Sequence, residues 1–322
     1  MSARVRVLGA GVAGLAAALE LAQAGAEVEV LELGAQPGGE AASRFAGGML
    51  APWCECVSAE PLVAELGRQA LDWWPRQYPG TVRNGTLVLA AARDAGELEA
   101  FAQRSDNYRR LDADGVATLE PELAGRFRQG LFFADEAHLD PRAALAALAV
   151  RVQELGVEVR CGVDARAQPD DGRTLLDCRG YAARDRLPEL RGVRGEMLLL
   201  HSDGVRFSRP IRLLHPRGMH YLVPRGDGRC MLGGSMLESD DAGAPSARAV
   251  MELLNAAYAL HPALAEARIL ELGHGLRPAF PDNLPRLQRR DGRWHLNGLF
   301  RHGYLLAPAL ARQAAARLLE AA

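Results

Sequence analysis

The stretch Arg4–Glu32, RVRVLGAGVAGLAAALELAQAGAEVEVLE, constrains the fold more than any other part of the sequence. Residues 5–8 are mostly apolar and predict a short buried strand, and the apolar pattern of Ala16–Ala24 predicts a helix that Gly25 ends. Residues 28–31 predict a second strand of the same kind. A strand, a helix and a strand in this order form a parallel βαβ unit, so we expect a doubly wound α/β sheet.

Three glycines with the spacing G-x-G-x-x-G, Gly9, Gly11 and Gly14, separate the first strand from the helix. The first permits a tight turn, the second lets the backbone approach a pyrophosphate, and the third lets the helix pack closely on the strand. A phosphate would then lie over the free N–H groups at the helix N-terminus. Glu32 ends the second strand and can accept hydrogen bonds from a ribose diol, so the stretch predicts a dinucleotide site.

The same stretch could instead be a secretory signal, with Arg4 and Arg6 as its charged flank and Ala22–Ala24 as its cleavage site. Cleavage there would remove all three glycines and leave Glu32 without a role. Glu20 also interrupts the apolar run, which is too short to span a bilayer. The dinucleotide site is therefore favoured.

A chain of 322 residues is long enough for one large domain or two of medium size. Its formal net charge of −2 gives no electrostatic reason to expect nucleic acid or an anionic membrane as a partner. The five cysteines are an odd number in a chain with ample core, so the cytoplasm is the expected compartment. Cys54 and Cys56 lack a second pair at zinc-site spacing, and no metal is expected. Assembly into a homo-oligomer is left open.

The loop Gly34–Glu55 is rich in glycine, alanine and serine and offers almost nothing to bury before Phe45. A segment of this length without regular structure is usually functional in a compact domain. Its paired glycines let backbone amides approach a ligand, and Arg44 could reach a phosphate. A flexible surface loop is the alternative, but directly after a dinucleotide fold a contact with the cofactor is favoured.

Helical and strand-like patterns alternate beyond this loop. The predicted helices are Glu60–Arg76, Glu97–Gln103, residues 141–155 with Asp140 as N-cap, Ser246–Leu260 and Pro308–Leu319. The predicted strands are Val82–Leu89, Gly130–Ala134, residues 157–159, Thr174–Cys178, Val193–Leu200, Met219–Val223, Cys230–Gly233 and Trp294–Leu299. We expect an α/β plus α+β fold, in which a Rossmann-like nucleotide-binding domain (1–80, 137–190 and 274–322) is interleaved with a smaller antiparallel-sheet domain (81–136 and 191–273).

Several patches together carry a resemblance to a known family. They are Gly47–Pro52 (GGMLAP), Tyr221–Arg225 (YLVPR), Gly275–Pro278 (GLRP), Pro281–Pro285 (PDNLP) and Phe300–Pro308 (FRHGYLLAP). With the N-terminal glycines, they resemble the glycine oxidase / D-amino-acid oxidase family of FAD-dependent oxidoreductases, and most of all its glycine oxidases of bacterial thiamine biosynthesis. The resemblance covers nearly the whole chain. It implies FAD as the cofactor, and it makes the two expected domains an FAD-binding and a substrate-binding domain.

The resemblance implies a substrate site in which Arg277 clamps a carboxylate and Tyr221 helps to hold it. A planar guanidinium suits a carboxylate better than an ammonium does. Met236 and Met49 correspond to methionines near the substrate and the flavin, and Arg301 corresponds to an arginine beside the flavin or at the pocket mouth. The structural alternatives are a salt bridge for Arg277 and core packing for Tyr221 and the two methionines.

For the FAD site, the resemblance implies contacts along the glycine motif, the loop after it, the nucleotide domain and the C-terminal patch. The implied residues are Gly9, Gly11, Val12, Ala13, Gly14, Glu32, Leu33, Arg44, Ala46, Gly47, Gly48, Met49, Leu50, Ala165, Gly180, Arg277, Arg301, His302, Gly303, Tyr304 and Leu305. Gly303 would offer an amide just before a helix that opens at Pro308, where the helix dipole favours negative charge on the reduced flavin.

The implied reaction is hydride transfer from the Cα of glycine, or of a similar small amino acid, to flavin N5, with O2 then reduced to hydrogen peroxide. The imine product would supply the thiazole of thiamine. Because the flavin carries the chemistry, no catalytic triad is needed, and His302 and His274 are disfavoured as bases. A D-amino-acid, sarcosine or D-proline oxidase or dehydrogenase is the alternative within the family. A non-catalytic flavoprotein would not need both Arg277 and Tyr221, and the patch around Gly303 disfavours a NAD-dependent dehydrogenase.

Some features depart from the family pattern. Residues 175–180 read LLDCRG, where the family has an apolar run into a turn of small residues, so Arg179 could touch the pyrophosphate. Trp53, Cys54 and Glu55 follow the GGMLAP patch and are bulky enough to line or narrow the approach to the pocket. The chain is also short for the family, and a long active-site lid is not expected.

Overall fold

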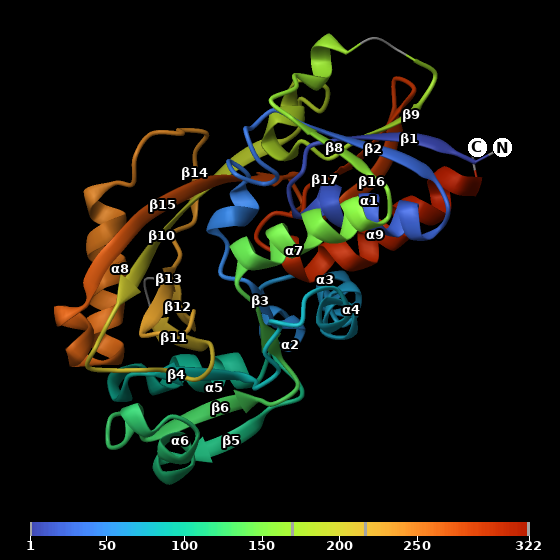
Figure 1. The fold of residues 1–322 in the computed structure, drawn as a ribbon. Coiled ribbons are helices and arrows are strands. Elements are labelled where there is room, and N and C mark those ends of the chain that lie inside the picture. The colour runs from blue at the N-terminus through green and yellow to red at the C-terminus, as the bar shows by residue number, and fades with distance from the viewer. Residues whose placement is uncertain (1, 169–170, 216–217, 321–322) are drawn as a thin grey trace.

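The computed structural model describes residues 2–168, 171–215 and 218–320, which form two lobes that are each built on one large sheet (Figure 1). A small antiparallel pair, β3 (Met49–Leu50) with β7 (Ala137–His138), lies between the lobes (Figure 1). The chain passes from one lobe to the other several times. The predicted fold class, a Rossmann-like part interleaved with an antiparallel-sheet part, is confirmed; the predicted domain bounds stay a prediction.

The first sheet is mostly parallel and has the strand order β16-β17-β9-β1-β2-β8. Its strands are β1 (Arg4–Leu8), β2 (Glu27–Glu32), β8 (Glu158–Cys161), β9 (Thr174–Asp177), β16 (Arg286–Arg290) and β17 (Arg293–Asn297). Helices α1 (Val12–Gln23), α7 (Pro141–Glu154) and α9 (Gly303–Glu320) lie together on one face (Figure 1). Val5 and Val7 of β1 point to one face of the sheet and are fully buried. Arg6 and Leu8 point to the other face and are also buried, as expected for a central strand of a parallel sheet that is covered on both faces.

The second sheet has the order β14-β10-β13-β12-β11-β4-β6-β5, and β15 pairs with β10. Its strands are β4 (Thr86–Ala90), β5 (Arg109–Asp112), β6 (Gln129–Phe133), β10 (Arg191–His201), β11 (Ile211–His215), β12 (Gly218–Pro224), β13 (Arg229–Gly233), β14 (Leu237–Glu238) and β15 (Arg268–Ala279). All of these pairs are antiparallel except β4 with β11. The long strands β10 and β15 extend from this sheet to the first lobe (Figure 1).

The remaining helices pack on the second sheet, on α9 of the first lobe or on each other. They are α2 (Pro52–Glu55), α3 (Pro61–Gly67), α4 (Ala70–Gln77), α5 (Ala95–Ala102), α6 (Ala113–Leu119) and α8 (Ala247–Leu260). The prediction of one helix over Glu60–Arg76 is wrong, because α3 ends at Gly67 before α4 begins. A Cβ at Gly67 would lie 2.7 Å from Leu305 of α9, so the break lies where the chain passes close to that helix. The predicted strand Val82–Leu89 starts late, at Thr86, because Gly85 turns the chain with φ +79°.

The prediction that the last helix opens at Pro308 is also wrong, since α9 begins at Gly303. A proline inside a helix leaves the carbonyl four residues earlier without its N–H partner. Here that carbonyl belongs to Tyr304, and the indole N–H of Trp74 donates to it at 2.8 Å. A residue from α4 therefore replaces the bond that Pro308 cannot make, and this tertiary contact lets the helix start one turn earlier.

Candidate functional site

A cavity of about 910 Å³ lies between the two sheets and extends from the carboxyl ends of β1 and β2 to the face of the second sheet. Its volume is near the top of the range of about 300–1,000 Å³ that is usual for small-molecule sites. Open α/β sheets bind their ligands outside the carboxyl ends of their strands. The cavity therefore begins where the sequence predicts a dinucleotide and continues toward the predicted substrate residues.

The glycine motif has the geometry that a close-approaching ligand requires. Gly9 has φ +95°, a conformation that L side chains rarely adopt. A Cβ at Gly14 would lie 1.9 Å from the carbonyl oxygen of Gly9, so only glycine lets α1 pack this closely on the turn. A Cβ at Gly11 would meet no atom closer than 3.5 Å, so this position is open on the cavity side.

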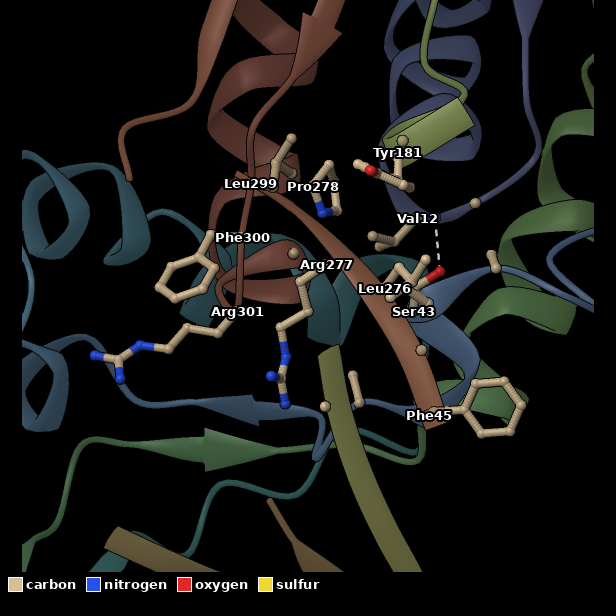
Figure 2. A pocket seen from close by; sticks show the side chains of 18 of the residues that line it. Val12, Ser43, Phe45, Tyr181, Leu276, Arg277, Pro278, Leu299, Phe300 and Arg301 are labelled. Carbon is tan, nitrogen blue, oxygen red and sulfur yellow. Dashed lines mark hydrogen bonds between the residues drawn. The ribbon is translucent and has the colours of Figure 1, made fainter. Parts of the chain in front are cut away.

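The start of α1 and the end of β2 form the first end of the cavity. The N–H of Val12 donates to Ser43 Oγ at 3.3 Å (Figure 2). Glu32 accepts from the N–H of Ala10 at 2.7 Å through Oε2 and from the N–H of Gly34 at 2.8 Å through Oε1. Each carboxylate oxygen can accept more than one bond, so Glu32 can hold the turn and still receive ribose hydroxyls.

Glu32→Gln is expected to raise the dissociation constant of FAD by about tenfold, which corresponds to a loss of about 1.4 kcal/mol. The amide keeps the shape, but its NH2 group would face one of the two backbone N–H donors, and charge-assisted hydrogen bonds are roughly twice as strong as neutral ones. Titration of the apoprotein with FAD measures the change. Glu27→Gln, an exposed change on the same strand, is the control that should bind FAD as the parent does. Unchanged affinity in Glu32→Gln would contradict the ribose assignment.

The start of α9 borders the middle of the cavity. Gly303 and Tyr304 line it there, and the first N–H groups of a helix have no partner within the helix. Gly47 lines the cavity too, and its carbonyl oxygen accepts from Arg225 Nη2 at 2.8 Å. Burial lowers the pKa of Arg225 from its usual value. Arg225, to which the sequence assigns no role, therefore fixes the loop that carries Gly47.

Arg277 projects from β15 into the cavity (Figure 2). Its Nη1 donates to the Ser235 carbonyl at 3.0 Å, and no carboxylate within the described ranges forms an ion pair with it. A Cβ at Gly195, on the adjacent strand β10, would lie 2.1 Å from Arg277 Nη2, so this glycine makes room for the guanidinium. Burial lowers the pKa of Arg277, and Tyr221 opposes that shift. An arginine stays charged in proteins, so the cavity holds a cation that has no anion of the described chain beside it.

Tyr221 lies next to Arg277 and is surrounded by glycines. Cβ atoms at Gly47 and Gly233 would lie 2.7 and 2.5 Å from atoms of its ring. A Cβ at Gly234 would lie 3.1 Å from the Tyr221 hydroxyl and 3.5 Å from Arg277 Nη2. The hydroxyl and the guanidinium therefore border the same small space, as a shared carboxylate site requires.

The cavity brings together most of the predicted site residues. Those that line it are Gly9, Gly11, Val12, Ala13, Glu32, Leu33, Ala46, Gly47, Ala165, Gly180, Tyr221, Met236, Arg277, Arg301, Gly303 and Tyr304. Those outside its lining are Gly14, Arg44, Gly48, Met49, Leu50, His302 and Leu305. Their assigned roles stay predictions.

The residues outside the lining have other surroundings. Gly14 packs α1 on its turn, Leu50 and Leu305 belong to the core of the first lobe, and Met49 packs against the core beside β4. Gly48 passes so close to Leu139 that a Cβ would lie 2.2 Å from its carbonyl oxygen.

Arg179 lines the cavity, but its guanidinium is already committed to two carboxylates. It donates to Asp177 at 2.7 Å and to Asp185 at 2.8 Å. Asp177 is fully buried and closes the end of β9. A contact with the pyrophosphate would compete with both ion pairs, so the arginine is better explained as the partner of a buried aspartate.

Arg212 and Glu55 are among the cavity residues to which the sequence assigned no function. Arg212 of β11 lies directly opposite Tyr221 of β12, so both side chains are on one face of the second sheet. Only the strand register shows this, and no sequence signal marks Arg212. Glu55 lies in the bulky segment after the GGMLAP patch, where the composition indicated a residue at the pocket but not its function.

Two further features of the described ranges bear on the class of protein. No group of three or more His, Cys, Asp and Glu side chains within them is arranged to hold a metal ion. None of the helices in the described ranges is both long and apolar enough to cross a membrane.

Comparisons with known proteins identify the family and support the fold. The profile of a family described as FAD dependent oxidoreductase (DAO) matches residues 4–317. A Rhizobium etli protein described as a thiamine biosynthesis oxidoreductase, ThiO, is 55% identical over 317 residues, which cover 98% of this chain and 96% of that protein. A glycine oxidase of Bacillus licheniformis is 26% identical, over 97% of this chain and 92% of its own length.

A solved structure shares the fold as well. The glycine oxidase of Bacillus cereus superimposes with a TM-score of 0.85 at 21% sequence identity, and the match covers 100% of this chain and 96% of that one. At this identity the likeness concerns the fold alone. It includes both lobes and hence the space between them.

Proposed function

The chain belongs to the DAO family of FAD-dependent oxidoreductases and uses FAD as its cofactor, and from that premise we propose that it oxidises glycine, or a similar small amino acid, to the imine. Molecular oxygen is the final electron acceptor and hydrogen peroxide the second product. The observation that carries the proposal is Arg277 beside Tyr221, without an acidic partner among the described residues, in the cavity that starts at the dinucleotide motif. A cation with no anion beside it suits a substrate that brings a carboxylate.

The residues of the cavity fit FAD. The open position at Gly11 and the N-terminus of α1 suit a pyrophosphate, and Glu32 suits a ribose. The N-terminus of α9, at Gly303, suits the electron-rich end of a flavin. When bound there, FAD supplies the hydride acceptor.

The chain's own residues bind and orient the substrate. Arg277 and the Tyr221 hydroxyl hold the carboxylate, which fixes where the α-carbon lies. A correctly held reactant contributes much of the acceleration by itself, so no acid or base in the cavity is required. Glycines at positions 195, 233 and 234 make room for the Arg277 guanidinium and the Tyr221 ring, so that these two polar groups lie close together.

We infer the metabolic role of the reaction from the chemistry of its product and from the description of one relative. An imine of glycine hydrolyses readily, and a thiazole-forming step of thiamine biosynthesis would consume it; the Rhizobium etli relative is described by that pathway. We also place the enzyme in the cytoplasm, because all five cysteines are free thiols, as is usual in reducing compartments.

A peroxide assay over a panel of amino acids tests the proposal. Glycine is expected to give the highest kcat/KM, ahead of sarcosine, D-alanine and D-proline, with one H2O2 formed for each O2 consumed. Amines that lack a carboxylate should react poorly, because they cannot use Arg277. Turnover with an artificial acceptor but without peroxide would indicate a dehydrogenase, and the absence of flavin reduction by every amino acid would refute the assignment.

A further inference from the structure

Glu55 joins three segments of the chain at the edge of the cavity. It ends α2, and its Oε1 accepts from Nη2 of Arg212 on β11. Its Oε2 lies 2.8 Å from Nη2 of Arg301 and 2.8 Å from Nε2 of His302, both in the turn that precedes α9. One carboxylate thus connects the second sheet to the start of α9, which borders the middle of the cavity.

This carboxylate is buried and ionised. Glu55 and Arg212 are only 7% and 6% exposed. Burial alone raises the pKa of Glu55, but the charges of Arg212 and Arg301 outweigh it and hold the pKa well below its usual range. Burial lowers the pKa of His302, so this imidazole is neutral and Glu55 balances arginines.

The contact fixes the direction of Arg301. Arg301 leaves the turn beside Arg277, and its side chain extends away from that of Arg277 (Figure 2). Its Nη2 also donates to Ser58 Oγ at 2.6 Å, on the same side as Glu55. Without the charge of Glu55, Arg301 would keep its hydrogen bonds to Ser58 and His302 but lose its ion pair, so it would be freer to turn toward a carboxylate at Arg277.

We propose that Glu55 is a positioning residue of the oxidation: it keeps Arg301 turned away from the carboxylate site of Arg277 and fixes the turn from which α9 starts. The proposal rests on the proposed function, because it assumes a substrate carboxylate at Arg277. In this role Glu55 does not hold the substrate carboxylate. Glu55 acts through Arg301 and His302, which precede α9, and through Arg212 on β11 of the second sheet.

Glu55→Gln tests this inference because it keeps the size of the side chain and removes its charge. The FAD-loaded variant is expected to bind acetate, a carboxylate without an amine, at least about threefold more tightly, since one negative charge is lost and Arg301 is free to contribute. Its kcat for glycine should fall by about ten- to a hundredfold, the effect that a misplacement of about 1 Å can have. Tighter carboxylate binding together with slower turnover is not expected of a merely destabilised protein.

Glu120→Gln is the matched control. Glu120 is 1% exposed and pairs with Arg209 at 2.9 Å, but it does not line the cavity. This control should lower the melting temperature and leave both the acetate dissociation constant and kcat unchanged. If Glu55→Gln behaved in the same way, with both quantities within twofold of the parent, Glu55 would be an ordinary structural ion pair and the proposal would be overturned.

A second variant covers the case in which Glu55→Gln does not fold, since breaking one partner of a buried pair is strongly destabilising. Glu55→Gln combined with Arg212→Met removes the pair as a unit and still leaves Arg301 unanchored. Its kcat is expected to stay at least about tenfold low, and a kcat within threefold of the parent would overturn the proposal. Acetate binding is measured from the change in the visible flavin spectrum. It therefore tests the role of Glu55 even if the parent protein does not oxidise glycine.

Discussion

Arg277→Ala is expected to retain FAD and to lose roughly 30- to 4,000-fold in kcat/KM for glycine. Truncating one partner of a buried, hydrogen-bonded charge pair costs about 2–5 kcal/mol, and each 1.4 kcal/mol corresponds to about a factor of ten. FAD should remain because the guanidinium borders the substrate end of the cavity, next to Tyr221 and Ser235. Steady-state kinetics and the flavin absorbance of the purified variant give the two measurements.

Arg277→Lys is the matched control for this prediction. It keeps the charge, but an ammonium cannot make the bidentate fork, so only part of the activity should return. Amines without a carboxylate should react no worse with Arg277→Ala than with the parent. If Arg277→Ala kept its kcat/KM for amino acids within threefold, the carboxylate clamp would lie elsewhere and the amino-acid oxidase assignment would lose its main residue.

Gly195→Ala is expected to lower kcat/KM by about a hundredfold although it adds only one methyl group. Its Cβ would lie 2.1 Å from Nη2 and 2.2 Å from Cζ of Arg277, so the guanidinium has to move. The end of a flexible side chain can shift at little energetic cost, so the protein should fold and bind FAD as before. A displacement of about 1 Å from the productive geometry can nevertheless cost about a hundredfold in rate.

The control for this change is Gly96→Ala, because a Cβ at Gly96, in α5, would meet nothing within 4 Å. It should leave turnover unchanged and stabilise α5 slightly, since alanine has the higher helix propensity. Thermal unfolding and steady-state kinetics of both variants separate the effects. Unchanged kinetics in Gly195→Ala would mean that the guanidinium does not need the position that it occupies here.

Local sequence was enough for the parts of the fold that depend on near neighbours. The βαβ unit of Arg4–Glu32 follows from apolar periodicity and from three closely spaced glycines between the first strand and the helix. Asp140 caps α7 as predicted, accepting from the N–H of Arg142 at 2.8 Å and of Ala143 at 3.2 Å. These interactions join residues within a few positions of each other, so they can be predicted from the sequence pattern.

Resemblance supplied what local pattern could not. Nothing in the spacing of GLRP or YLVPR places Arg277 near Tyr221, which is 56 positions away in the sequence, 277 against 221. The family likeness predicted both residues, and the structure places them around one small space. Their functional roles stay predictions until the variants are measured.

The sequence by itself determined the dinucleotide motif and the family, because short-range spacing and recognisable patches specify them. Only the tertiary structure decided where α9 begins, since that depends on the contact of Trp74 with the Tyr304 carbonyl. It also decided that Arg212 faces the cavity and that Glu55 unites it with Arg301, because strand register and contacts between distant segments set these neighbours. Such contacts join segments that are distant in the sequence, and no periodicity along the chain records them.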